Sequence, residues 1–223
     1  MSPARQSFEF VMVDDSDDAR WFVELSSCAA DLVEARDALG LALRSMADDA
    51  SPLQDAERSL VANAAMAYCR TFFPSKVRRP VTNVVEIPQE FAATHQRVAM
   101  FRNRAIAHSQ SDLSVTYALG VLDAETLEVR DVMAPNISST MPRELVRDFL
   151  DLVNTVAEGL DEVIEPIRLR LMGRLTDADR AALVKDGPRP TVRVLPAAEF
   201  GSQTTRPPYP TSHPVYWTRG EDR

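Results

Sequence analysis

The residues best suited to chemistry lie in one short stretch, Phe101 to Ser109, which reads Phe-Arg-Asn-Arg-Ala-Ile-Ala-His-Ser. It places arginine, amide and imidazole groups within about two helical turns. An imidazole titrates near neutral pH and can move a proton, and a guanidinium binds phosphate oxygens in pairs without losing its charge. Such groups suit the cleavage of a phosphodiester. By spacing alone, however, surface or structural roles in an Arg- and Ala-rich helix are the commoner explanation.

The string from Arg102 to Ser109 resembles the signature of the HEPN superfamily, in which an arginine and a polar residue are followed, after a short spacer, by a histidine. Here five residues separate Arg102 from His108, and Asn103 stands at the polar position. A looser similarity covers roughly residues 17–171 and includes a helix end at 67–70 and a helix start at 87–95.

This resemblance implies an antiparallel helical bundle and a metal-independent endoribonuclease of the toxin or antiphage-defence type. In that scheme His108 takes the proton of a ribose 2′-hydroxyl or protonates the 5′-oxygen, while Arg102 stabilises charge on the phosphorane and Asn103 orients one of its oxygens. One histidine cannot easily be both acid and base, so the resemblance also implies a homodimer whose two motifs face one cleft. RNA, and an antitoxin or regulatory protein, are the other partners it implies.

Further arginines surround the motif in a chain whose net charge is −8. This acidic balance argues against general coating of nucleic acid, so any RNA contact must be local. The expected substrate-binding residues are Arg70, Arg78, Arg79 and Arg104. Residues six positions apart on an ideal helix diverge by about 120°, whereas Arg104 and His108 share a face, so the choice between Arg102 and Arg104 stays open. Ordinary solvated arginines would give the same pattern.

Composition narrows the class of protein. With 223 residues, 45% of them hydrophobic, the chain can bury one sizeable core. The sequence has no membrane-length apolar run and no signal-peptide pattern, so we expect a cytoplasmic protein without membrane contact. Cys28 and Cys69 stand singly in apolar helical patterns and are expected in the core. We expect no metal, since the histidines do not have the spacing of metal ligands, and no cofactor, since there is no phosphate-binding glycine loop. His95 is expected to pack or to cap a helix.

Hydrophobic periodicity predicts a mainly α fold. The expected helices cover about 17–46, 52–72, 88–108, 142–167 and 177–187, opened by Asp17-Asp18, Ser51-Pro52, Pro88, Pro142 and Thr176. An inserted β-hairpin is predicted at about 114–133, turning at 123–126. We therefore expect a HEPN-like helical domain over 1–187 and a Pro-rich tail over 188–223 that is extended or disordered.

A second hypothesis belongs to another class: a catalytically silent HEPN-like protein that binds or dimerises through the same helix and recruits a partner with its tail. Ion pairing distinguishes the two. Catalysis requires that His108 and the arginines converge in an open, polar cleft. A binding protein can have those arginines neutralised by carboxylates.

Overall fold

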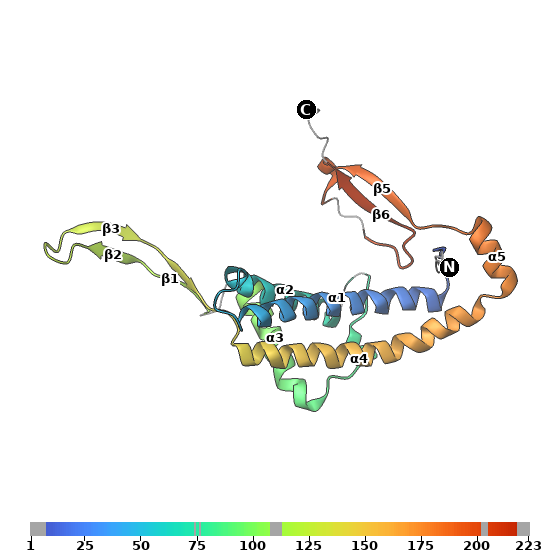
Figure 1. Cartoon of the computed structure of the whole chain (residues 1–223), viewed down its shortest axis with the longest axis horizontal. Helices are drawn as coiled ribbons and strands as arrows, with labels where there is room; N and C mark the ends of the chain where they lie inside the picture. Colours follow the sequence, from blue (N-terminus) through green and yellow to red (C-terminus); the bar gives the residue numbers. More distant parts are fainter. Residues whose placement is uncertain (1–7, 74, 76, 108–112, 202–204, 218–223) are drawn as a thin grey trace, which may run out of the picture. The chain divides into compact units, whose positions relative to one another are not determined.

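The computed structural model describes residues 8–73, 75, 77–107, 113–201 and 205–217. It is mainly helical with a few short strands, as predicted (Figure 1). The chain divides into two compact units: a central unit, Cys28–Phe73 with Pro80–Asp161, and a terminal unit, Met1–Ser27 with Pro74–Arg79 and Glu162–Arg223. Helices α1 (Asp17–Ser45) and α4 (Arg143–Arg174) contribute residues to both units. Among the described residues, no helix is long and apolar enough to cross a membrane.

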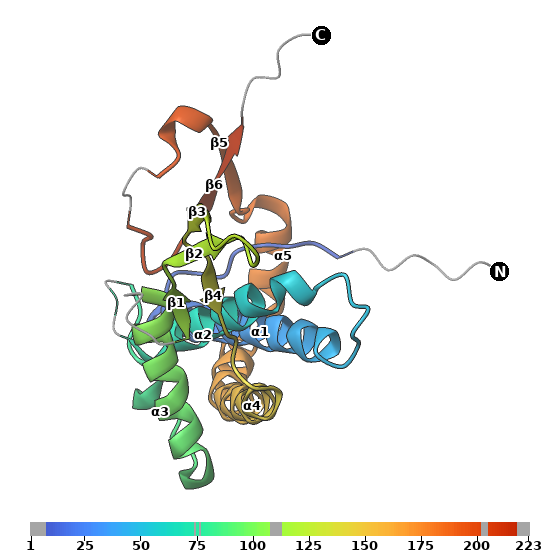
Figure 2. The same ribbon diagram turned by 90° about the vertical axis from the view of Figure 1, so that its left-hand side faces the viewer.

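The core of the central unit is formed by α1, α2 (Glu57–Phe72), α3 (Ala92–Phe101) and α4. Because apolar side chains recur at helical spacing, each helix presents one buried stripe. The largest fully buried side chains of this unit include Leu32, Leu39, Tyr68, Val98, Phe149 and Leu152. The Tyr68 and Phe149 rings meet edge-on with centroids 5.3 Å apart, which joins α2 to α4. Helix α3 lies beside α2 (Figure 2).

Helix starts follow local chemistry, with two corrections to the sequence prediction. The first helix is capped by Ser16, whose Oγ accepts from the Ala19 N–H at 3.2 Å, and the Asp17-Asp18 pair lies inside the first turn. The second helix begins at Glu57 and not at Pro52, because the Ser51 hydroxyl accepts from the Leu53 N–H and holds a turn there.

The third and fourth helices start close to their predicted prolines. Pro88 has an extended backbone, with φ −58° and ψ 144°, and a 3₁₀ turn over Gln89–Phe91 leads into α3 at Ala92. The third helix therefore starts slightly later than expected, whereas α4 begins at Arg143, directly after Pro142.

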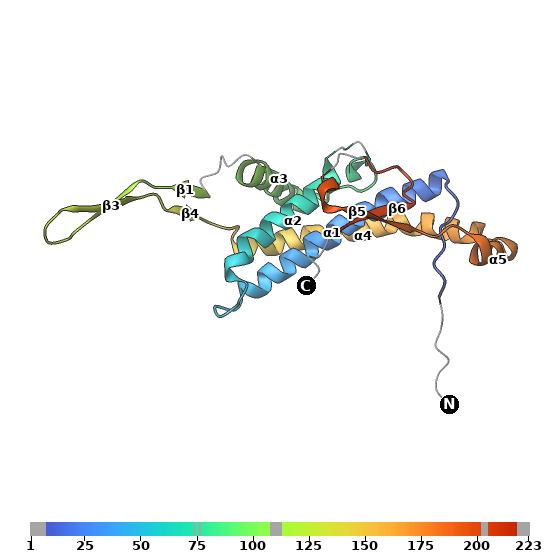
Figure 3. The same ribbon diagram turned by 90° about the horizontal axis from the view of Figure 1, so that it is seen from above.

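The predicted β-hairpin is confirmed and is longer than expected. Strand β2 (Leu119–Leu122) pairs antiparallel with β3 (Val129–Met133), and β1 (Ser114–Thr116) pairs antiparallel with β4 (Asn136–Ser138). We call residues 114–138 the arm (Figures 1 and 3).

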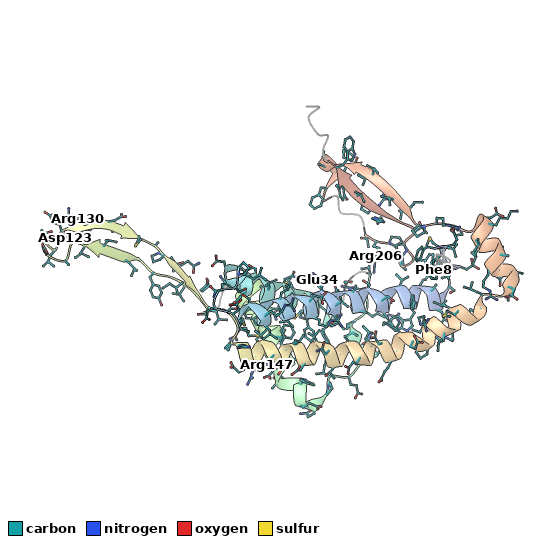
Figure 4. The ribbon with its side chains drawn as sticks, viewed as in Figure 1. Phe8, Glu34, Asp123, Arg130, Arg147 and Arg206 are labelled. Atoms are coloured by element: carbon teal, nitrogen blue, oxygen red, sulfur yellow. The ribbon has the colours of Figure 1, made fainter. Side chains whose placement is uncertain are left out.

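Asp123 holds the turn of the arm. Its Oδ1 accepts from the backbone N–H groups of Glu125 and Thr126, and Arg130 donates to its Oδ2 at 3.0 Å (Figure 4). The Thr126 N–H and the Arg130 guanidinium lower the pKa of Asp123 to about 2. The carboxylate is therefore ionised over the whole neutral range.

The terminal unit contains α5 (Asp177–Asp186), whose predicted cap is confirmed. Thr176 Oγ1 accepts from the Asp179 N–H, and the Asp179 carboxylate accepts from the Thr176 N–H at 3.0 Å. Within the predicted tail, β5 (Thr191–Pro196) pairs in parallel with β6 (Ser212–Trp217). The Tyr209 hydroxyl donates to the carbonyl of Val13, which ties this region to the N-terminal segment. The division of the chain at 187–188 stays a prediction.

Candidate functional site

The motif begins where α3 changes its helical pitch. Helix α3 ends at Phe101, and Arg102–Ala107 continue as a π-helical turn, which we call the π segment. A π turn closes i→i+5 hydrogen bonds, is rare, and occurs often at functional sites. The predicted helix therefore continues as far as Ala107 in a wider form. His108 lies outside the described residues, so its position stays a prediction.

Arg102 occupies the side of this helix that faces the end of α2. Its guanidinium carbon lies 5.2 Å from the centroid of the Phe73 ring, and its Nη1 donates to Asn103 Oδ1 at 2.8 Å. Its Nε is buried and has no hydrogen-bond partner among the described residues. Burial raises the pKa of the nearby Cys69 thiol to about 11, and the Arg102 charge opposes this rise. Arg102 and Asn103 thus form a positively charged site in which the Arg102 Nε–H has no partner among the described residues.

Arg104 belongs to the opposite side of the same helix. It is exposed, as are Arg97 and Met100, and these three positions follow a helical spacing of three and four residues. We call them the outer stripe of α3, although Arg104 lies in the π segment that continues this helix. Positions two apart on a helix point in nearly opposite directions, which separates Arg104 from Arg102. The choice that the sequence left open now rests on environment: Arg102 is held in the positively charged site with Asn103, and Arg104 faces solvent.

The other predicted substrate-binding arginines are held by groups of the chain itself. In the central unit, Arg70 binds Asp31 at 2.8 Å and also binds Glu34 (Glu34 is labelled in Figure 4). Two of the residues predicted to bind substrate are found in the terminal unit, Arg78 and Arg79. A phosphate would have to displace the Arg70 carboxylates, so Arg70 is poorly placed to bind one.

The two arginines of the terminal unit are also engaged. Arg79 binds Glu24 at 2.8 Å and lies over the Trp21 ring at 3.9 Å. Arg78 donates through Nη1 to the carbonyl oxygen of Ser27 at 3.1 Å. These contacts fasten Arg78 and Arg79 to α1.

One feature of the sequence distinguishes the arginines in and near the motif from Arg70, Arg78 and Arg79. Residues 91–111 contain no Asp or Glu, although the chain as a whole has 33 of them. Within the described part of the chain, Arg97, Arg102 and Arg104 accordingly make no salt bridge. This absence of Asp and Glu around the motif is visible in the sequence, but the sequence prediction did not use it.

His95 is a packing residue, as predicted, but its partner was not foreseen. Its Nδ1 and the hydroxyl of the fully buried Tyr68 are hydrogen-bonded at 2.9 Å, and its ring contacts Phe72 with centroids 4.8 Å apart. Burial lowers the pKa of His95 and raises that of Tyr68. His95 and Arg102 are seven residues apart and lie on the same side of α3, since seven residues make about two turns.

Comparison with protein-family models, with curated proteins and with solved structures found no match to this chain. In the described residues, no group of three or more His, Cys, Asp and Glu side chains could hold a metal ion. The case for a function therefore rests on the motif and on its surroundings.

Proposed function

We propose that this protein is a HEPN-like endoribonuclease that cleaves RNA with Arg102, Asn103 and His108. The observation that carries the proposal is the state of Arg102. In a chain of net charge −8, this arginine makes no ion pair with any described residue, and its buried Nε has no hydrogen-bond partner there. A buried N–H group without a partner costs about 1–3 kcal/mol, and a phosphate oxygen would satisfy it. The helical character of the central unit is compatible with this proposal.

In the proposed reaction the ribose 2′-oxygen attacks the adjacent phosphorus and the bond from phosphorus to the 5′-oxygen breaks. His108 accepts the 2′-hydroxyl proton or protonates the leaving 5′-oxygen, and the other proton transfer comes from His108 of a second copy. Arg102 stabilises the charge on the phosphorane oxygens, and Asn103, whose Oδ1 accepts from Arg102, holds the guanidinium in place. The products carry a 2′,3′-cyclic phosphate and a 5′-hydroxyl. A toxin or antiphage-defence role, with an antitoxin or regulatory protein as partner, belongs to the same proposal.

A cleavage assay on total RNA tests the proposal. The wild-type protein should cut RNA with and without EDTA, leave cyclic phosphate ends and spare a 2′-deoxy substrate. His108→Ala should lower the rate by about 100- to 10,000-fold, the usual worth of a positioned proton-transfer group. His213→Ala is the matched control, because His213 is exposed on β6 and lies far from the motif in sequence. Loss of cleavage on chelation, or an unchanged rate for His108→Ala, would refute the mechanism.

The carboxylate contacts of Arg70 and Arg79 favour a second candidate function, that of a non-catalytic HEPN-like binding or dimerisation protein. Neutralised arginines stabilise a fold and add little to a phosphate site. Under this alternative the wild-type protein leaves RNA uncut, and Arg102→Met and His108→Ala alter neither RNA binding nor RNA integrity.

A further inference from the structure

The arm exposes an unusual amount of apolar surface. Every residue of β2, β3 and β4 is exposed. The large apolar side chains exposed on the arm are Tyr117, Leu119, Val121, Leu122, Leu127, Val129, Val132, Met133 and Ile137. Single apolar residues on a surface are ordinary, but a contiguous group of this kind marks an interaction site.

Both faces of the arm are apolar. Leu119 pairs with Met133, and the next residue on each strand, Gly120 and Val132, pairs on the opposite face. Beyond the register shift, Leu122 pairs with Val129. A strand pair that had one face on its own protein would alternate apolar with polar residues. The arm therefore has apolar side chains on both faces, and either face can be covered by a partner.

The described residues of the chain do not supply that cover. An isolated two-stranded hairpin is at best marginally stable in water, and this one gains its order from the Asp123 turn and its backbone ladder. Val129 and Val132 remain 66% and 69% exposed. Among the described residues, therefore, the apolar surface of the arm stays open to a partner.

The net charge of the arm indicates which kind of partner fits it. The arm carries Asp123, Glu125, Glu128 and Asp131 against Arg130, which is a net charge of −3. Two arms would repel each other, and so would an arm and RNA. The best complement is a surface that is both basic and apolar.

The outer stripe of α3 is such a surface. Residues 91–111 carry a charge of +3 with neutral histidines, and within the outer stripe the Met100 side chain is 50% exposed between Arg97 and Arg104. Arg97 and Arg104 have no carboxylate partner among the described side chains. Met100 and the arm are both exposed in the single chain, so the arm does not cover the stripe of its own chain.

We propose that the arm of one chain packs over the outer stripe of α3 in a second copy. A two-fold axis makes the exchange reciprocal, so that two equivalent interfaces form. The apolar side chains on the face of the arm that carries Leu122, Val129 and Val132 provide the core of each interface, and the usual size of a stable interface is about 800 Å² per partner. The inference does not depend on RNA cleavage, because association is measured without a substrate.

Sedimentation velocity of the full chain at micromolar concentration tests the arm. The wild type should be a dimer, and Val129→Lys with Val132→Lys should make it a monomer with an unchanged circular dichroism spectrum. The matched control is Val33→Lys with Leu41→Lys, which changes two exposed apolar residues of α1 and should leave the dimer intact. A monomeric wild type, or a dimeric arm variant, would overturn the proposal.

Charge reversal and cross-linking test the surface that the arm contacts. Arg97→Glu should weaken association by at least about tenfold, whereas Arg58→Glu, an exposed arginine of α2, should not. A chain with Val132→Cys should cross-link to a chain with Met100→Cys, since the native Cys28 and Cys69 are buried. Cross-linking of Val132→Cys chains to one another would instead indicate contact between arms, and failure of the mixed pair in a dimeric sample would also refute the proposed contact.

Discussion

Replacing Arg102 with methionine should separate stability from function at the proposed site. Methionine keeps the length of the aliphatic stem but removes the charge and every N–H group. The loss of the unpartnered buried Nε–H should stabilise the fold by about 1–3 kcal/mol. Against this, the contact with the Phe73 ring, at 5.2 Å, is worth about 0.5–1 kcal/mol. The exposed hydrogen bond to Asn103, at 2.8 Å, is worth about 0.5–1.5 kcal/mol.

The three contributions nearly cancel and leave a gain of about 0.3 kcal/mol at the midpoints of their ranges, so the fold should keep its stability while RNA cleavage is lost. Urea unfolding measures this balance: the midpoint and the slope should stay nearly unchanged, and the melting temperature should shift by about 1 °C or less. Arg70→Met is the matched control: it removes the ion pairs to Asp31 and Glu34 and should cost about 1 kcal/mol. If Arg102→Met lowers stability by more than about 1 kcal/mol, Arg102 is a structural anchor and the argument from its unused N–H group is wrong.

Three further outcomes follow from the packing. Burial lowers the pKa of His95, so between its folded-state pKa and about 6.5 the unfolded chain binds more protons, and the stability present at higher pH is lost as pH falls. Thermal melts of wild type should show this loss, and His95→Gln should reduce it; equal slopes would contradict the assignment. Gly159→Leu should cost about 1–3 kcal/mol in urea unfolding, because a Cβ there meets Val85 Cγ1 at 3.0 Å, whereas Gly173→Leu, with nothing within 4 Å of its Cβ, should not. Thr176→Ala should cost about 1 kcal/mol by removing the α5 cap, measured by hydrogen exchange, and Thr176→Ser should restore protection.

Much of the fold depends on interactions between residues close together in the chain, and these can be predicted from the sequence. The α5 cap needs only Thr176 and Asp179, three residues apart, and the β-hairpin needs only two β-rich runs around a polar turn. Helix α2 stops at Phe72 as predicted, because Phe73 takes an extended backbone. The prediction was less accurate where a side chain accepts a hydrogen bond from a nearby backbone N–H group. The Ser51 hydroxyl does so and holds a turn, and α2 therefore begins later than predicted.

The site depended on contacts between residues far apart in the chain. Sequence spacing proposed Arg70, Arg79 and Arg102 alike, but it does not record which carboxylates lie opposite each arginine. Glu24 and Asp31 reach their partners across 55 and 39 residues, whereas no carboxylate reaches Arg102 among the described residues. The role of His108 stays a prediction from the sequence. An arginine's charge is determined by its type, but whether that charge is available for a substrate is determined by its neighbours, and only the tertiary structure selects those.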